Sequence, residues 1–265
     1  HNKMIHAMEG MVRQARRHNP NIDIVFLYTA NEKHIATYQA GETPREITAH
    51  DAVAAHYGIP SVSFAADVAQ RMANGDFDWK KFGGTHPAPF GADIYASDVK
   101  SLLTDVCLDR GEATSHDLPA PMEALNYEQG RFVELESAQV ENGWTLSEPD
   151  WKALPGKTRK QFVDIPMLWA DQPGATLTLP FTGSAVGMFI VSGPDAGTVE
   201  YSIDGGKVQA VDLFTTYSRG LHYPWTCMFG SDLEPGDHTL TLRVSDQKNG
   251  KSKGTAVRIK TFVAN

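Results

Sequence analysis

One histidine of the chain stands in a local sequence that could give it a catalytic role. His86 follows the pair Gly83-Gly84 and precedes Pro87. Glycine permits positive φ angles and close backbone approach, while proline keeps the residue before it out of helical geometry. A histidine held on a rigid loop at the mouth of a sheet is a common arrangement for a general base. Chemistry alone nevertheless favours the plainer interpretation, a surface histidine that only packs or caps.

The groups that could work with His86 are less well defined. Asp76 and Asp78 precede it in the same predicted loop, so either carboxylate could orient the ring through Nδ1, and a backbone carbonyl could do so instead. No serine stands in a Gly-x-Ser-x-Gly or Gly-Asp-Ser turn. Ser61 and Ser63 alternate with apolar residues in a predicted strand, which favours a structural role for both.

The stretch GGTHPAPFGADIYA, residues 83–96, closely resembles the last motif block of the SGNH (GDSL-type) hydrolases. That block is an Asp-x-x-His-Pro followed by a glycine and by a Tyr-Ala pair on the final helix. The resemblance covers about residues 1–108. In the family the histidine activates a serine nucleophile for acyl transfer, so the resemblance implies that role for His86.

The chain departs from the family pattern in two respects. Glycine stands at position 83, where the family has its aspartate, and this slightly favours a Ser-His dyad over a displaced aspartate. The serine block and the glycine and Asn-Asp blocks, which lie upstream in the family, are absent. The resemblance therefore implies that the nucleophile and most oxyanion-hole donors come from an upstream segment or a separate chain. The chain alone is expected to be inactive.

The elements that would position His86 form an α/β pattern. Apolar residues recur at helical spacing through residues 3–18, Gly58 stands where a helix opened by Pro44 should end, and 23–28 is an apolar run typical of a buried parallel strand. Ile94, Tyr95, Val99, Leu102 and Leu103 predict a docked helix after His86. The predicted helices are 3–18, 44–57, 67–74 and 93–108, and the predicted strands are 23–28 and 59–64, with loops between them.

Two parallel strands cannot bury both faces of a doubly wound sheet, and an isolated pair is marginal. The pattern therefore predicts that further strands come from an upstream segment or a second chain. The family comparison agrees, since SGNH domains carry strands that precede the place where this chain begins. The sequence resembles the second part of a larger hydrolase.

Residues 109–128 are polar and proline-rich and are predicted to be a linker. From 129 to 265 short strands alternate with Gly, Pro and Asp turns, which predicts an all-β sandwich of jelly-roll type. The motifs SIDGG and LEPGDHTLTLRV resemble the accessory β-sandwiches of carbohydrate-active enzymes. The predicted strands include 132–135, 176–179, 198–203, 238–244 and 256–262.

An aromatic cluster lies within residues 215–225 of this second part. Tyr217, His222, Tyr223 and Trp225 occur there with Arg219 nearby. Such rings suit sugar stacking or an interdomain seam, and Tyr223 and Trp225 are the predicted substrate contacts. The alternative is sandwich core plus a strand connection.

Composition excludes several classes of partner. The 265 residues carry a formal charge of −8, which argues against nucleic acid, and residues 13–18 form the only basic cluster, predicted to be a solvated helix end. No apolar run approaches the roughly 20 residues of a membrane span. Cys107 and Cys227 have no metal-type spacing, so no metal or other cofactor is expected. The two cysteines could form an interdomain disulfide, but two buried thiols are favoured.

These observations predict part of an SGNH-type serine esterase that removes acetyl or other small acyl groups from a carbohydrate. Its partners would be the upstream SGNH segment with the serine nucleophile and an acylated carbohydrate. The carbohydrate rests only on the predicted sandwich. The alternative is a non-catalytic carbohydrate-binding protein with a decayed SGNH site. The compartment is open, with a secreted or periplasmic location favoured over the cytoplasm.

Overall fold

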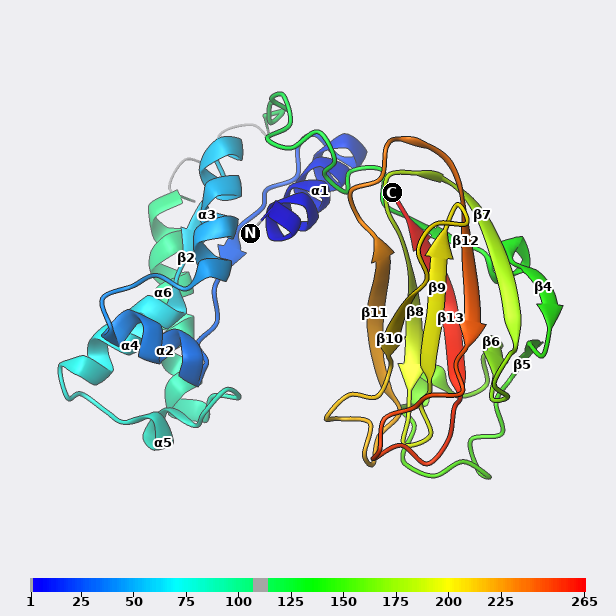
Figure 1. Cartoon of the computed structure of the whole chain (residues 1–265). Coiled ribbons are helices and arrows are strands. Elements are labelled where there is room, and N and C mark those ends of the chain that lie inside the picture. The colour runs from blue at the N-terminus through cyan, green and yellow to red at the C-terminus, as the bar shows by residue number, and fades with distance from the viewer. Residues whose placement is uncertain (1, 107–113) are drawn as a thin grey trace. The chain divides into compact units, whose positions relative to one another are not determined.

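The chain folds into two compact units, His1–Glu128 and Gln129–Asn265 (Figure 1). A computed structural model describes residues 2–106 and 114–265. Each unit has its own hydrophobic core. In Figure 1 the first unit is coloured from blue to green and is mostly helical, while the second, from green to red, is built of strands.

The first unit alternates helices with two very short strands. β1 and β2 pair in parallel, as the α/β pattern predicts, with Phe26 opposite Ser61 and Leu27 opposite Val62. Both strands are shorter than the predicted 23–28 and 59–64. The elements are α1 (Asn2–His18), β1 (Phe26–Leu27), α2 (Glu32–Gln39), α3 (Arg45–Tyr57), β2 (Ser61–Val62), α4 (Phe64–Ala73), α5 (Trp79–Phe82) and α6 (Pro89–Val106).

Several helix starts differ from the sequence prediction, since α5 forms in an expected loop and α6 begins at Pro89 rather than Asp93. Side-chain capping explains two further differences, at α2 and α4. Residues 29–43 were expected to be a loop, but α2 forms there because the Asn31 side chain accepts a hydrogen bond from the His34 amide at 2.9 Å. α4 begins at Phe64 rather than Asp67, because Ser63 Oγ accepts from the Ala66 amide at 3.2 Å. Ser63 is therefore a helix cap and not a strand residue.

The prediction of a linker at 109–128 is wrong for its described part, residues 114–128. This segment is bonded to α1 and α3 by a buried polar network. Glu9 is fully buried, and its carboxylate accepts from the Tyr57 hydroxyl at 2.7 Å and from the amides of Met122 and Glu123 at 2.6 and 3.0 Å. Because each donor is buried or partly buried against Glu9, the segment is fixed to the first unit.

The basic end of α1 is likewise not a solvated helix end. Arg13 and Arg16 are buried, Arg13 pairs with Glu128, and its guanidinium also donates to the carbonyl oxygen of Pro119 at 2.7 Å. Arg16 donates to the carbonyl oxygen of Tyr57 at 2.9 Å. Buried charges require such partners, and the 114–128 segment supplies several of them.

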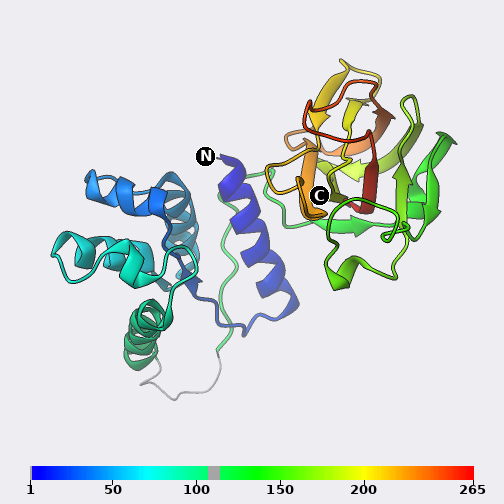
Figure 2. The ribbon, with the colours of Figure 1, turned by 90° about the horizontal axis from the view of Figure 1, so that it is seen from below.

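The second unit is a β-sandwich of two antiparallel sheets, which Figure 2 shows end-on as two layers. One sheet has the order β10-β9-β12-β7-β4 and the other β11-β8-β13-β6-β5, with β3 also paired to β13. The strands are β3 (Arg131–Val133), β4 (Gln139–Asn142), β5 (Thr145–Ser147), β6 (Met167–Ala170), β7 (Thr176–Gly183), β8 (Val186–Ser192), β9 (Thr198–Ile203), β10 (Gln209–Asp212), β11 (Tyr223–Gly230), β12 (Gly236–Val244) and β13 (Val257–Ala264).

Alternating side chains of both sheets form the core between the layers. On β7 and β12, Leu177 and Leu179 pair with Leu242 and Leu240, and all four are fully buried. The prediction of a sandwich is confirmed, and the finer assignment to the jelly-roll type stays a prediction. Cys227 is a buried free thiol here, and burial raises its pKa to about 11, while Cys107 lies outside the described residues.

Replacing Glu9 tests the network that fixes residues 114–128. Glu9→Ala leaves one buried and two partly buried donors without this acceptor, so we expect a loss of about 3 kcal/mol or more in the unfolding free energy of the first unit. Urea denaturation monitored by circular dichroism measures it. The control Glu42→Ala, at an exposed position, should stay within about 0.5 kcal/mol of the parent. Equal stability of the two variants would contradict this account.

Candidate functional site

His86 lies in a tight connection between α5 and α6. Asp78 caps α5, its carboxylate accepting from the Lys81 amide at 2.7 Å. The helix ends at Gly83, and the fully buried Phe82 anchors the turn. The Phe82 carbonyl oxygen then accepts from the Ala88 amide at 2.9 Å. This bond closes the loop, so that His86 is held at the start of α6.

The geometry of this loop explains why glycine stands at position 83. Gly83 has a φ of +105°, in the left-handed region, and a Cβ there would lie 2.0 Å from the backbone nitrogen of Ala88. Gly91 is constrained similarly, since its Cβ would lie 2.4 Å from the Phe82 carbonyl oxygen. In this conformation, position 83 cannot carry an aspartate.

The structure does not join His86 to either candidate carboxylate. The imidazole is exposed, and no hydrogen bond links it to another side chain within the described residues. Asp78 uses one carboxylate oxygen to cap α5, and Asp76 is exposed after α4. Orientation of His86 by Asp76 or Asp78 therefore stays a prediction.

Tyr95 fixes the N-terminal half of α6 beside the residues that follow the two parallel strands. The Tyr95 hydroxyl accepts from the amide of Ala30, just after β1, at 2.8 Å. The Tyr95 ring stacks on Phe64, just after β2, with centroids 4.1 Å apart and planes at 16°. Burial raises the pKa of Tyr95, which keeps this hydroxyl neutral. The carboxyl ends of parallel strands are where open α/β sheets bind ligands.

The two serines considered as nucleophiles both have structural contacts in the described part of the first unit. Ser61 Oγ donates to Asp51 at 3.2 Å and Ser63 caps α4, in keeping with the structural roles expected for both. Within the described residues no cluster of three His, Cys, Asp or Glu side chains could hold a metal, and no helix there has the length and apolar character needed to cross a membrane.

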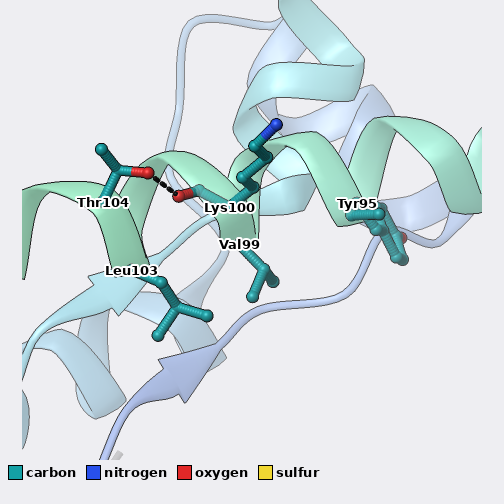
Figure 3. A pocket seen from close by; sticks show the side chains of 6 residues that line it. Tyr95, Val99, Lys100, Leu103 and Thr104 are labelled. Carbon is teal, nitrogen blue, oxygen red and sulfur yellow. Dashed lines mark hydrogen bonds between the residues drawn. The ribbon is translucent and has the colours of Figure 1, made fainter. Parts of the chain in front are cut away.

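The sequence did not predict how exposed α6 is. Its docked face was expected to include Ile94, Val99 and Leu103, but only Ile94 of these is buried. Tyr95, Val99 and Leu103 instead line an open apolar groove of about 540 Å³ (Figure 3). Their i, i+4 spacing is the signal of an apolar face, but sequence alone does not say what covers it.

In the second unit the aromatic cluster divides into a surface pair and core residues. Tyr217, exposed to 63%, stacks on Tyr223 with centroids 4.8 Å apart and planes at 27°. Trp225 is half-buried and packs against the sandwich core, because it shares the inward face of β11 with Cys227. His222 is fully buried and bonds the Pro155 carbonyl oxygen through Nε2 at 3.0 Å, and burial lowers its pKa.

No family model and no curated protein matches the chain. A two-domain esterase (CEX) active on acetylated mannans superposes on 98% of this chain and on 68% of its own, with a TM-score of 0.74 at 17% identity. Its structure co-crystallised with mannopentaose gives 98% and 67%, with a TM-score of 0.73 at 16% identity. A family two carbohydrate esterase from Cellvibrio japonicus covers 51% of this chain and 32% of its own, at 15% identity and a TM-score of only 0.33. The first two matches show that this chain has the fold of the superposed part of that esterase.

The two glycines before His86 provide a matched test of the loop geometry. Gly83→Ala combines a positive φ with a backbone collision, so we expect it to destabilise the first unit by about 3 kcal/mol or more. Gly84→Ala has a φ of +83° but no atom within 4 Å of the new Cβ, so about 1 kcal/mol is expected. Chemical denaturation measures both. If Gly83→Ala destabilises the first unit no more than Gly84→Ala does, the described loop geometry is wrong.

Proposed function

We propose that this chain is the histidine-bearing part of a serine esterase of SGNH type, which removes acetyl or other small acyl groups from a carbohydrate. The observation that carries the proposal is the closed loop that presents an exposed His86 ahead of α6, the helix whose Tyr95 contacts the residues that follow β1 and β2. Support comes from the fold shared with an esterase active on acetylated mannans.

In the proposed reaction, a serine hydroxyl supplied by an upstream segment attacks the acyl carbon while His86 takes its proton. The C–O bond to the sugar then breaks, and His86 returns the proton to the leaving alkoxide. Water attacks the acyl-enzyme in the same manner, giving the free acid and the serine hydroxyl. Oxyanion donors would also come from the upstream segment, so the chain alone would be inactive.

The contact at position 83 favours a Ser-His dyad. The family's aspartate site is sterically closed, and Asp78 is already engaged at the start of α5. A backbone carbonyl could orient the ring instead. A hydrogen bond from one ring nitrogen to such an oxygen fixes which of the two nitrogens carries the proton. Asp76, the other candidate carboxylate, is exposed after α4.

The carbohydrate substrate has separate support in the second unit. Tyr217, which is exposed and stacks on the half-buried Tyr223, offers an aromatic surface suited to a sugar ring, whereas Trp225 packs against the sandwich core. We propose an accessory sandwich of jelly-roll type that holds the glycan. A polysaccharide substrate would place the protein outside the cytoplasm, in the medium or the periplasm.

The test of the mechanism is His86→Ala in the complete gene product. If His86 is the base, kcat/KM for 4-nitrophenyl acetate or an acetylated mannan should fall by about a thousandfold or more. His18→Ala, at the exposed end of α1, is the matched control and should retain full activity. Unchanged hydrolysis by the His86 variant would exclude the proposal. The same assay on Asp76→Asn and Asp78→Asn separates the two arrangements, since a dyad predicts little loss from either.

The competing function is glycan binding by a protein with a decayed catalytic site. Its basis is Gly83, where the SGNH pattern has an acid. In that case the complete protein would bind acetylated mannan and hydrolyse no ester, with or without His86.

Replacing the surface tyrosines tests the proposed glycan contact. Tyr217→Ala and Tyr223→Ala should each weaken binding to acetylated mannan by about tenfold, because each removes part of a stacked pair. Affinity electrophoresis or calorimetry measures it. Phe132→Ala, at another exposed aromatic position of the second unit, is the control. If all three variants lose the same affinity for acetylated mannan, or none loses any, the tyrosine pair does not bind the glycan.

A further inference from the structure

One histidine of the second unit has an oxygen acceptor at each of its ring nitrogens. His238 Nδ1 lies 2.6 Å from a carboxylate oxygen of Asp204, and Nε2 lies 2.8 Å from the backbone carbonyl oxygen of Glu234. An ionised carboxylate and a carbonyl oxygen only accept hydrogen bonds. A neutral imidazole has one N–H donor, whereas the imidazolium has two. Both contacts are therefore hydrogen bonds only while the ring carries two protons.

The surroundings of the ring also favour its charged form. Phe181 on β7 stacks on His238, with centroids 5.4 Å apart and planes at 30°, and an aromatic face attracts a cation. The charged groups that act on the ring are the carboxylates of Asp204 and of Asp237, the preceding residue on β12. The Asp204 side chain is half exposed, so the ion pair alone contributes little. The second acceptor is what makes the number of protons on the ring important.

The two acceptors belong to different turns of the sandwich. Asp204 begins the turn between β9 and β10 and has a φ of +52°. Glu234 lies in the turn between β11 and β12, where the Leu233 amide donates to the Ser184 carbonyl oxygen at 2.9 Å. His238, near the start of β12, bonds to both turns. The motifs SIDGG and LEPGDHTLTLRV are thus joined in space by this one ring.

We propose that His238 is a proton-dependent clasp that ties the turn between β11 and β12 to the turn after β9 while its ring carries two protons, and that it releases the first of these turns when Nε2 loses its proton. The release occurs at Nε2 because the charged Asp204 carboxylate keeps the remaining proton on Nδ1. The Nε2 lone pair then faces the Glu234 carbonyl oxygen, and two acceptors without a proton between them repel each other.

The ring can exchange its protons with solvent, and the direction of the pH dependence follows from its bonds. His238 borders an open hollow of about 430 Å³. The bond to Asp204, and then the bond to the Glu234 carbonyl oxygen, raise the pKa of His238 above its ordinary value of 6.5. A group whose pKa is raised by folding stabilises the fold fully below its unfolded pKa and loses this effect as the pH rises through the folded pKa. The clasp is therefore closed in mildly acidic solution and opens in alkaline solution.

His222, the other histidine in the sequence of the second unit, has the opposite dependence. Burial lowers its pKa, so its contribution to stability is lost as the pH falls rather than as it rises. A loss of protection on the alkaline side of pH 6.5 can therefore be assigned to His238 and not to His222.

Nuclear magnetic resonance of the 265-residue chain tests the clasp. Long-range proton–nitrogen spectra should show both ring nitrogens of His238 protonated at about pH 5.5, and Nε2 alone deprotonated at about pH 8.5. Across the same transition the protection factor of the Leu233 amide should fall about fivefold, which corresponds to one ordinary hydrogen bond. The Val244 amide, bonded to the Ala175 carbonyl oxygen at the far end of β12, is the internal control and should not change.

Substitutions of the clasp residues separate it from general effects of pH. In His238→Gln the protection of the Leu233 amide should stay near the parent's alkaline level from about pH 5.5 to 8.5, because the titrating ring is gone. Asp204→Asn removes the charge that raises the pKa of His238, so the transition should move to lower pH. Asp246→Asn, at an exposed position beyond the other end of β12, is the matched control and should leave the transition in place.

Three results would overturn the clasp. The first is a His238 ring that titrates at or below the ordinary pKa of 6.5. The second is a neutral ring that keeps its proton on Nε2, and the third is Leu233 protection that does not follow the titration or that still falls in His238→Gln. None of these measurements uses ester hydrolysis, so the clasp is tested separately from the proposed function.

Discussion

The hydrogen bond between the Ala88 amide and the Phe82 carbonyl oxygen determines most of what the candidate site can do. It brings the two helices around the His86 loop so close that neither Gly83 nor Gly91 has room for a Cβ. The loop is therefore specified by its backbone rather than by side-chain contacts of the histidine. Such a loop presents an imidazole without needing an acid to hold it in place.

The contact between the Ala88 amide and the Phe82 carbonyl oxygen also bears on the proposed Ser-His dyad, because it leaves no room for an acidic side chain at position 83. A carboxylate beside a catalytic histidine fixes its tautomer and stabilises the imidazolium that forms. If His86 is the proposed base, groups outside the motif would have to perform both tasks, because position 83 is closed to a side chain. Because the backbone contact of the loop itself requires glycine at position 83, the absence of an acid there is not by itself a sign of a decayed site.

The sequence predicted the elements well where the signal is local, and failed where a partner is distant. Gly58 at the end of α3 and the alternating Leu residues of β12 act through their immediate neighbours, and those elements formed as predicted. Arg13 meets Glu128 across 115 positions, so no pattern within α1 could show that its basic end is buried. Helix α2 was missed even though Asn31 is a typical cap, because its apolar residues are few.

The open surface of the first unit follows from how sheets gain stability. A pair of strands with two residues each contributes little stability through its hydrogen bonds. The helices around β1 and β2 bury only one face of this pair. The helical core on that face, from Ile47 and Val53 to Phe82, is well packed nonetheless. Within the described residues the first unit thus has a packed core on one face of the strand pair and exposed apolar side chains, Leu27 among them, on the other.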